Sequence, residues 1–246
     1  MTDLLLFQLR RVGRNRQYLL FTVVLPALFT VFFTKVVGGQ VAAGDYQAVA
    51  GATMVSMMSY GAIGAALGAT IRLAFDRSSG WLRQLRVTPV PPPAVLAVDV
   101  AVGALLVLPS LVVVALVGRF VNGVHLGAGT WLALVAVLWA GSVVFVALGV
   151  AVGLVLDAQA AGAAIGILGT ILAALGGLWF PVELFPAGMV PLAHAMPSYW
   201  FAELGRDVAA GTPSLLPVLV LAGFGVVFAA AALLAAVRRP LHAVAG

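Results

Sequence analysis

Residues 131–156 read WLALVAVLWAGSVVFVALGVAVGLVL, a run of 26 residues without a charged side chain. A helix crosses the hydrocarbon core of a bilayer, roughly 30 Å thick, with about 20 apolar residues, so this run is long enough to span a membrane. Five more apolar runs of spanning length occur along the chain, at 18–37, 48–71, 94–118, 160–180 and 215–237. The pattern predicts six transmembrane helices.

The composition of the whole chain supports this prediction. Of 246 residues, 63% are hydrophobic and 9% are charged, and the mean hydropathy is +1.15. A soluble domain of this size needs roughly a quarter of charged residues to cover its surface. The period-two alternation of a membrane barrel is missing, and helices are the other way to satisfy the backbone in lipid. We therefore predict an all-α membrane protein, with residues 1–246 forming a single transmembrane domain.

The placement of the basic residues predicts the orientation. Only Lys35, Arg119 and Arg206 fall on one side of the predicted spans, and the acidic residues divide equally between the two sides. An excess of Lys and Arg marks the cytoplasmic side, so both termini are predicted to be cytoplasmic. The pI near 10.4 then reflects topology and not a nucleic-acid-binding patch. The ten basic residues of the other side are Arg10, Arg11, Arg14, Arg16, Arg72, Arg77, Arg83, Arg86, Arg238 and Arg239.

A cleaved signal peptide is an alternative reading of the N-terminus, because Val41, Ala42 and Ala43 resemble a cleavage site. The length of the first run and the membranous character of everything after it favour a retained span. Before that span, Leu5, Leu9 and Val12 share one helical face, which is typical of a helix lying in the membrane interface over residues 1–16. A simple basic anchor is the alternative.

The sequence contains little that supports catalysis or metal binding. It has no cysteine, and its three histidines, His125, His194 and His242, are far apart. We therefore predict no metal site. A phosphate-binding loop of the Gly-x-x-x-x-Gly-Lys-Ser/Thr type is also missing from the sequence, so the chain does not hydrolyse ATP itself. No cluster of carboxylates or histidines favours an enzyme.

Two connections are too long to be simple loops, and residues 72–93, on the predicted cytoplasmic side, form the first. Within it, Trp81, Leu82 and Leu85 form a compact apolar face on a short helix that ends at Thr88-Pro89. An exposed apolar and basic helix is suited to docking into a groove on a cytosolic partner. The alternative is a loop that only sets topology, with Trp81 in the lipid interface.

This loop also resembles the coupling segment of type-2 ABC exporter permeases, including bacterial drug-resistance permeases. The resemblance lies in the run SGWLRQLRVTP at 79–89. The family often carries Glu-Arg before the Gly, and this chain has Asp76-Arg77, which keeps the charges. The resemblance implies contact with an ATPase subunit through Asp76, Arg77, Gly80, Trp81, Leu82, Arg83, Leu85, Arg86, Thr88 and Pro89.

The second long connection, residues 181–214, is similar to the segment that precedes the last span of the same family. The matching residues are Pro181, Glu183, Phe185-Pro186 and Met196-Pro197. The resemblance implies short re-entrant helices on the outer side, and the prolines alone already exclude one straight span. Glu183, expected to be buried among neighbouring apolar side chains, either faces the exit of a transport path or caps a helix.

Two further sets of residues in the spans have alternative interpretations. Met54, Met57, Met58 and Tyr60 form a stripe on the second span that either lines a route for a lipophilic substrate or belongs to the core. Pro181, Glu183 and Pro186 complete this candidate path or outer gate. Glycines at 61, 64 and 68 and at 162, 166 and 169 predict close helix packing, and the family resemblance adds a dimer contact through the first and fifth helices.

Together, the resemblance implies a non-catalytic permease subunit of an ATP-driven exporter in a bacterial inner (plasma) membrane. Two permease chains, alike or different, would pair with two ATPase subunits that bind ATP and Mg, and this chain would hold no cofactor. The apolar spans and short outer loops favour a lipophilic cargo, such as an antibiotic or other drug, as in multidrug efflux, or a lipid. The alternatives are a nucleotide-independent six-helix transporter or channel, and a membrane-bound lipid-modifying enzyme.

Overall fold

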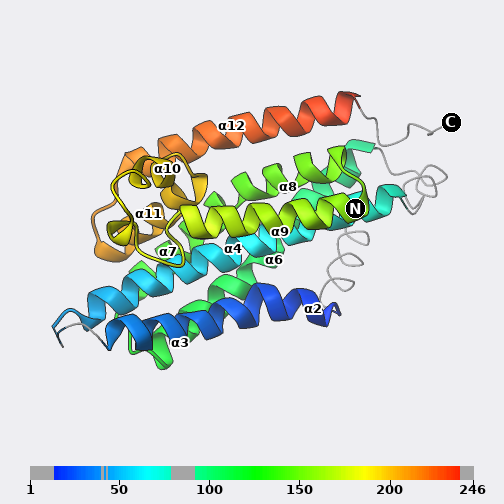
Figure 1. Cartoon of the computed structure of the whole chain (residues 1–246). Coiled ribbons are helices and arrows are strands. Elements are labelled where there is room, and N and C mark those ends of the chain that lie inside the picture. Colours follow the sequence, from blue (N-terminus) through cyan, green and yellow to red (C-terminus); the bar gives the residue numbers. More distant parts are fainter. Residues whose placement is uncertain (1–13, 40–41, 43, 79–91, 239–246) are drawn as a thin grey trace.

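The computed structural model describes residues 14–39, 42, 44–78 and 92–238. The long helices lie side by side, roughly parallel, in one bundle (Figure 1). Six helical segments of the described chain are long and apolar enough to cross a membrane, which confirms the predicted all-α class. Residues 1–13 of the predicted interfacial helix and 79–91 of the predicted coupling loop lie outside the described residues.

The six spans follow the order of the predicted runs. The first consists of three consecutive pieces: α2 (Arg16–Leu19), the π-helix η1 (Leu20–Val24) and α3 (Leu25–Gly38). The others are α4 (Tyr46–Ser78), α6 (Pro92–Phe120), α7 with α8 (Ala128–Gly141 and Val143–Val155), α9 (Ala158–Leu175) and α12 (Leu215–Arg238). The shorter η2 (Val182–Leu184), α10 (Val190–His194) and α11 (Pro197–Ala210) lie between α9 and α12.

Helix α4 is the centre of the bundle. It packs against α3, α6, α8, α9 and α11, and 72% of its spanning window is buried, against 11% for α12. Its partners approach closely through small residues: a Cβ added to Gly149 of α8 would collide with the hydroxyl of Thr70. Van der Waals contact between closely packed helices replaces the hydrophobic effect as the driving force inside lipid. The core of the protein therefore lies along α4.

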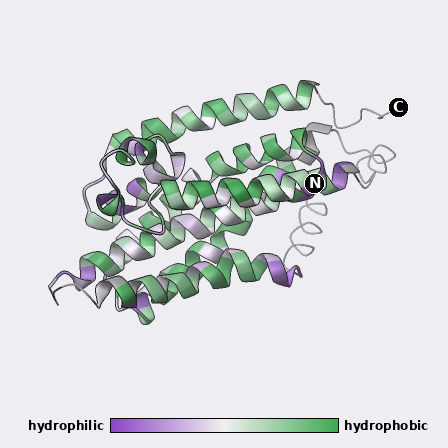
Figure 2. Cartoon of the chain, in the orientation of Figure 1, coloured by the Kyte–Doolittle hydropathy of each residue, from purple (hydrophilic) through white to green (hydrophobic). Residues whose placement is uncertain are grey.

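The outside of the bundle is apolar. Figure 2 shows hydrophobic residues along the length of the helices and hydrophilic ones mostly toward the two ends. On α12, Leu219, Val226 and Leu233 are all more than 60% exposed. Contiguous exposed apolar surface of this extent does not occur on monomeric soluble proteins. A lipid-facing surface accounts for it.

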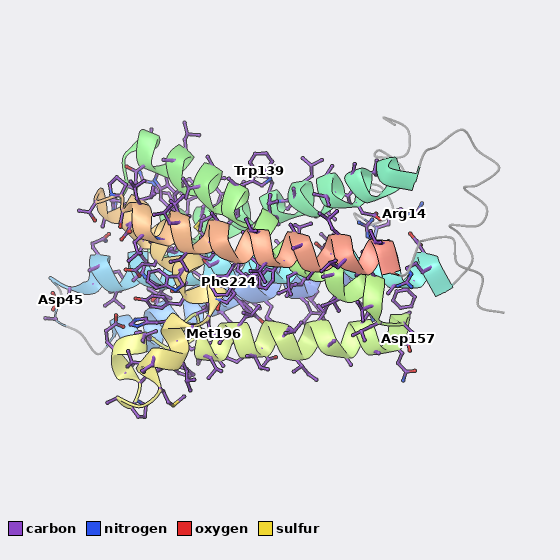
Figure 3. All side chains as sticks on the ribbon, turned by 90° about the horizontal axis from the view of Figure 1, so that it is seen from above. Arg14, Asp45, Trp139, Asp157, Met196 and Phe224 are labelled. Carbon is purple, nitrogen blue, oxygen red and sulfur yellow. The ribbon has the colours of Figure 1, made fainter. Side chains whose placement is uncertain are left out.

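The two ends of the bundle carry different charges. Figure 3 places Arg14 and Asp157 at one end and Asp45 at the other. The first end, which we call the arginine end, also carries Arg16 and the last turns of α4 with Arg72 and Arg77. Helix α12 ends there as well (Figure 1). The predicted topology requires this arrangement. The start of the first span, the end of the second span and the end of the last span all lie at this end.

The second span is longer than the hydropathy pattern predicts. The apolar run ends at residue 71, but α4 continues to Ser78, so Asp76 and Arg77 lie on this helix and not in a loop. Arg77 Nη1 donates hydrogen bonds to the carbonyl oxygens of Gly153, at 3.1 Å, and Leu154, at the end of α8. Carbonyls in the last turn of a helix lack intrahelical donors, and a cation satisfies them well. These partners let charged turns of α4 remain inside the bundle.

The fifth span is shorter than predicted. The apolar run extends to residue 180, but α9 ends at Leu175, and Gly177 adopts a positive φ of 71° that reverses the chain. Glycine is the residue that tolerates this conformation. The fourth span is interrupted at Ser142, whose hydroxyl donates to Trp139 O at 2.6 Å.

The connection before the last span is broken, as its prolines predict. Pro197 stands at the start of α11, and Gly211, with φ of 74°, ends that helix. Helix α11 packs back against α4 and α7, and the ring of its buried Phe201 lies 5.2 Å from that of Phe145 in α8. The segment is therefore part of the packed bundle. Its re-entrant position relative to the membrane remains a prediction.

Candidate functional site

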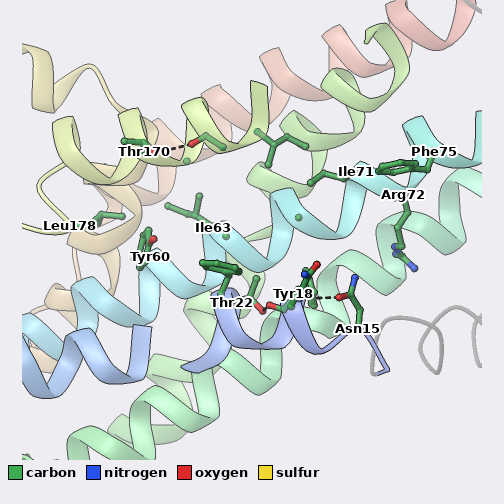
Figure 4. Close-up of a pocket in the computed structure, with 17 residues that line it drawn as sticks. Asn15, Tyr18, Thr22, Tyr60, Ile63, Ile71, Arg72, Phe75, Thr170 and Leu178 are labelled. Atoms are coloured by element: carbon green, nitrogen blue, oxygen red, sulfur yellow. Dashed lines mark hydrogen bonds between the residues drawn. The ribbon is translucent and has the colours of Figure 1, made fainter. Parts of the chain in front are cut away.

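A cavity of about 580 Å³ lies between the first span, α4 and α9 (Figure 4). It begins at the arginine end, beside Asn15 and Arg72, and reaches the middle of the bundle at Tyr60 and Leu178. Its volume falls in the usual range for ligand-binding cavities, about 300–1,000 Å³. The lining residues are Asn15, Gln17, Tyr18, Phe21, Thr22, Tyr60, Ile63, Gly64, Gly68, Ile71, Arg72, Phe75, Ile165, Gly166, Gly169, Thr170 and Leu178.

On the cavity wall, Tyr18 of the first span contacts α4. The Tyr18 hydroxyl donates to Ala65 O at 2.9 Å, and a Cβ added to Gly68 would lie 3.0 Å from the Tyr18 ring. Asn15 begins the helix by accepting the Tyr18 N–H through its side-chain oxygen at 3.1 Å. The hydroxyl of Thr22, which lies in the π-helix η1, donates to Tyr18 O at 2.7 Å. Short π-helical turns occur preferentially at functional sites.

Glycines provide the space inside this cavity. A Cβ added to Gly64 of α4, or to Gly166 or Gly169 of α9, would meet no heavy atom of the described chain within 4 Å. These positions therefore leave room for a ligand where a larger side chain would fill it. The expectation of close packing holds for Gly61, which faces Pro26 and Ser110, and for Gly68, which faces Tyr18. It does not hold for Gly64 or for the glycines of α9.

A second, smaller cavity of about 160 Å³ lies toward the opposite end, between α4, α11 and the turn after α9. Leu178 lines both cavities, so they are neighbours. The smaller one brings together three of the residues proposed from sequence for the path, although they are far apart in the chain. Its lining residues are Phe33, Val49, Ala52, Thr53, Ser56, Met57, Gly177, Leu178, Trp179, Pro181, Val182, Glu183, Tyr199 and Arg206.

Aromatic rings lie between the two cavities. Tyr60 lines the larger cavity, and its ring is 5.8 Å from that of Trp179, which lines the smaller one. The ring of Phe29 lies 6.3 Å from that of Tyr60 and 5.6 Å from that of Phe33. The Phe33 ring in turn lies 5.9 Å from that of Phe180. Edge and stacked pairs at such distances are favourable contacts. We call the four rings of Tyr60, Trp179, Phe29 and Phe33 the aromatic partition; the Phe180 ring is more than half exposed and is not part of it.

The smaller cavity has a charged wall on α11. Arg206 forms an ion pair with Glu203 at 2.8 Å, donates to Ser56 Oγ of α4 at 3.4 Å, and lies 5.8 Å from the centre of the Tyr199 ring. Burial raises the pKa of the Tyr199 hydroxyl, and the negative charge of Glu203 raises it further. Burial and the same carboxylate also raise the pKa of Asp207. The wall therefore carries both signs of charge near its rim.

The residues proposed for the path from sequence separate into different places. Met57 lines the smaller cavity and Tyr60 the larger, whereas Met54 and Met58 are fully buried and line neither of the two. Met54 packs on Gly118 of α6, where an added Cβ would collide with it. A helix turns 100° per residue, so a stripe of neighbouring methionines faces several directions.

The three residues proposed for the outer gate are also separated. Pro181 and Glu183 line the smaller cavity. Pro186 lines neither cavity, and its carbonyl accepts the N–H of Met189 at 2.8 Å. Glu183 is exposed, so the expectation that it is buried among apolar neighbours is wrong. Those neighbours, Phe180 and Leu184, are themselves more than half exposed because η2 projects from the end of the bundle.

The residues proposed for coupling fall mostly outside the described ranges. These are Gly80, Trp81, Leu82, Arg83, Leu85, Arg86, Thr88 and Pro89. The other two lie on the last turns of α4, where Asp76 is buried and Arg77 binds the end of α8.

The residues that sequence reasoning missed are those of the first span and α9. Tyr18 and Asn15 precede an apolar run and have the ordinary appearance of a helix start. The glycines of α9 are spaced like packing glycines. Their spacing does not show that no helix of the described chain faces them.

Comparisons with known proteins bear on this arrangement. Residues 39–234 match the sequence model of the family described as ABC-2 family transporter protein. The chain belongs to this family. It is also 29% identical to the protein named "Putative transport permease YvfS" of Bacillus subtilis (strain 168), over 225 residues that cover 90% of each chain. The family match includes α4, α9 and the whole segment before the last span, so most of the walls of both cavities lie in it.

The two cavities of this ABC-2 transporter chain differ in the polarity of their walls. The larger cavity offers apolar walls with a few polar groups at one end, and the smaller cavity is polar on one side. The larger cavity is therefore suited to holding a molecule with an apolar body.

Proposed function

We propose that this ABC-2 transporter chain is the permease subunit of an exporter that is driven by ATP hydrolysed on a separate subunit. The observation that carries the proposal is the apolar cavity of about 580 Å³ between the first span, α4 and α9, in a chain of this family. Its substrate is lipophilic, a drug-like compound or a lipid. In this proposal ATP and Mg are bound by the partner ATPase and not by this chain.

The order of the cavities supports a path through the bundle. The larger one begins at the arginine end, which the excess of Lys and Arg assigns to the cytoplasm. The aromatic partition separates it from the smaller cavity near the opposite end. In the proposed cycle, the substrate enters the larger cavity, the partition opens, and the substrate leaves past Glu183 and Arg206. Such a change requires two states that the ATPase binds with different affinity.

The coupling segment is where the ATPase is proposed to act. Residues 79–91 continue directly from α4, whose last turns bind α8 through Arg77. Docking of Trp81, Leu82 and Leu85 into an ATPase groove would transmit movement along α4 to the wall of the larger cavity. The same helix contributes Gly64, Gly68 and Arg72 to that wall.

Replacing Leu82 or Leu85 with Asp is expected to abolish copurification of a phosphate-loop ATPase from native membranes, because a carboxylate on the docking face must be desolvated without a partner. The measurement is mass spectrometry of the affinity-purified complex. Val87→Asp adds the same charge in the same segment, on the far side of the predicted helix from Trp81, Leu82 and Leu85, and should keep the ATPase. Recovery of the ATPase with the Leu variants contradicts the coupling role. A wild-type chain that purifies with no ATPase contradicts the exporter itself.

A second permease chain is proposed to complete the transport path. The cavity is flanked by exposed apolar side chains, among which Phe21 is 62% and Ile167 61% exposed. The open glycines Gly162, Gly166 and Gly169 would let another helix approach closely. A copy of this chain or a related permease placed on that face would enclose the larger cavity on its open side.

A further inference from the structure

We infer that the larger cavity takes an apolar molecule that carries a hydrogen-bond acceptor, such as a ketone or ether oxygen, and that the hydroxyl of Tyr60 binds this acceptor at the deep end of the cavity. The inference rests on the proposed function, because it names the substrate class of the same cavity. It comes from the hydrogen bonds that the hydroxyl groups of the cavity wall make.

Tyr60 differs from the other hydroxyl-bearing residues of this wall. The hydroxyls of Tyr18, Thr22 and Thr170 donate to backbone carbonyl oxygens at 2.9, 2.7 and 2.9 Å, so these donors are occupied within the bundle. The hydroxyl of Tyr60 has no hydrogen-bond partner within the part of the chain that the structure describes. Since Tyr60 lines the cavity and is only partly buried, its hydroxyl is available to a ligand.

Neighbouring rings hold Tyr60 in a fixed position. Its ring is stacked on that of Phe29 at 6.3 Å and meets that of Trp179 edge to face at 5.8 Å. Tyr60 lies near the middle of α4, twelve residues from Arg72, which is about 18 Å along the helix. Figure 4 shows Arg72 on one side of the cavity and Tyr60 with Leu178 on the other. The donor is therefore placed far from the arginine end.

The surroundings of this hydroxyl are apolar. Ile63 and Leu178 line the cavity with it, and the open positions of Gly64, Gly166 and Gly169 leave space for a ligand. A hydrogen bond is stronger in apolar surroundings than in water, and a polar group left there without a partner raises the free energy. A molecule that fills the space with apolar groups and presents one acceptor gains from both burial and hydrogen bonding.

A second donor at the aromatic partition favours an acceptor as the matching group. Trp179 Nε1 is buried and has no hydrogen-bond partner among the described residues, and Trp179 lines the smaller cavity. An indole N–H only donates, whereas a phenol both donates and accepts. The partner that suits both Tyr60 and Trp179 is therefore an acceptor. Neither group is charged, so an uncharged oxygen is sufficient.

Photolabelling with two matched probes tests the inference. The probes are hexadecane that carries a diazirine and the same molecule with an added ketone, applied to the purified full-length chain in phosphatidylcholine nanodiscs. Labelling of α4 and α9, found by peptide mapping, is divided by labelling of the lipid-exposed α12 in the same sample, which corrects for partitioning into the bilayer. This ratio should be about fivefold higher for the ketone, which is the effect of one neutral hydrogen bond.

Tyr60→Phe should remove the preference for the ketone and leave labelling by the alkane unchanged, because it deletes the hydroxyl and keeps the ring. Tyr46→Phe is the matched control: it deletes a hydroxyl from the same helix at a residue that lines neither cavity, and it should keep the preference. Equal ratios for the two probes in the wild type, an unchanged preference in Tyr60→Phe, or an equal loss in Tyr46→Phe would overturn the inference.

The carbonyl band of the ketone provides a second measurement. With an isotope label on its carbonyl carbon, infrared spectra of the ketone bound to the chain in maltoside detergent should show a component at lower frequency, because a hydrogen bond weakens the C=O bond. Tyr60→Phe should remove this component, and its absence from the wild type would also overturn the inference. Neither readout needs an ATPase. Absence of ATP-dependent export would overturn the proposed function while the hydrogen bond to Tyr60 stands.

Discussion

Tyr18 connects the start of the first span to the central helix α4. It contacts α4 twice, through its hydroxyl on Ala65 O and through its ring beside Gly68, and it forms part of the larger cavity. Asn15 and Thr22 fix the helix on either side of it. This small set of contacts holds the wall of the cavity that lies outside the range of the family match.

Tyr18→Phe is expected to lower the free energy of unfolding by about 0.5–1 kcal/mol, because it removes one interhelical hydrogen bond and keeps the ring. The measurement is denaturant unfolding of the purified chain in detergent. Tyr18→Ala should cost more, since the contact with Gly68 is lost as well. Equal stability of Tyr18→Phe and the wild type would show that the hydroxyl contributes no net stability.

Glu183 is the exposed carboxylate at the smaller cavity, so its charge and not its packing is available for function. We expect Glu183→Gln to impair ATP-dependent export several-fold without loss of assembly. The measurement is uptake of a lipophilic dye into inside-out vesicles. Asp45→Asn, an exposed acid at the same end that lines neither cavity, is the control and should export normally. Full export by Glu183→Gln would favour a purely structural role.

Helix α9 has a glycine-rich face that no other part of the described chain covers. Asp157 caps its start by accepting the Ala160 N–H at 2.8 Å, and its buried residues, such as Ala161 and Ile165, face α4 and α8. The glycine side has no partner within the described chain. Glycine in a helix interior costs about 1 kcal/mol relative to alanine, so three of them need a compensating use. Space for a ligand, or for a second chain, provides one.

Gly166→Leu is expected to abolish export, because the new side chain would occupy the larger cavity, where an added Cβ meets no atom. Export into vesicles and the amount of folded protein are measured together. Gly162→Leu is the comparison: it lies one turn away on the same open face and does not line the cavity, so it reports the proposed contact with a second chain alone. If both variants lose export equally, the glycine face serves packing against a second chain and not the cavity.

The whole molecule has one face that packing within the chain does not explain. Phe21 of the first span, which lines the larger cavity, and Ile167 of α9, next to the lining residue Gly166, are each about 60% exposed. A second permease chain on this face, as proposed above, would bury these side chains and close the cavity.

Cysteine crosslinking tests this assembly, and the natural absence of cysteine keeps the experiment clean. Ile167→Cys is expected to form a disulfide-linked dimer in native membranes under mild oxidation, as seen on a non-reducing gel. Leu219→Cys on α12, equally exposed at 66%, is the control and should remain monomeric. The reverse result would place the permease contact on α12.

Hydropathy predicted the spans well and their ends poorly. The ends of α4 and α9 differ from the ends of the apolar runs because they depend on local contacts and backbone conformation. Arg77 donates to carbonyl oxygens of α8, and Gly177, with its positive φ, turns the chain after α9. The site was predicted in part. Pro181, Glu183 and Met57 meet at one cavity, but Glu183 is exposed and the larger cavity was not foreseen beyond Tyr60.

The sequence by itself determined that this protein is a six-helix membrane bundle with one basic end, because a spanning helix needs only its own apolar length to enter lipid. It also carried the family resemblance, which depends on local motifs. Only the tertiary structure decided which glycines pack and which leave space, and that two cavities lie on either side of an aromatic partition. Those features depend on what faces a side chain across the bundle, and no pattern within a single helix contains that information.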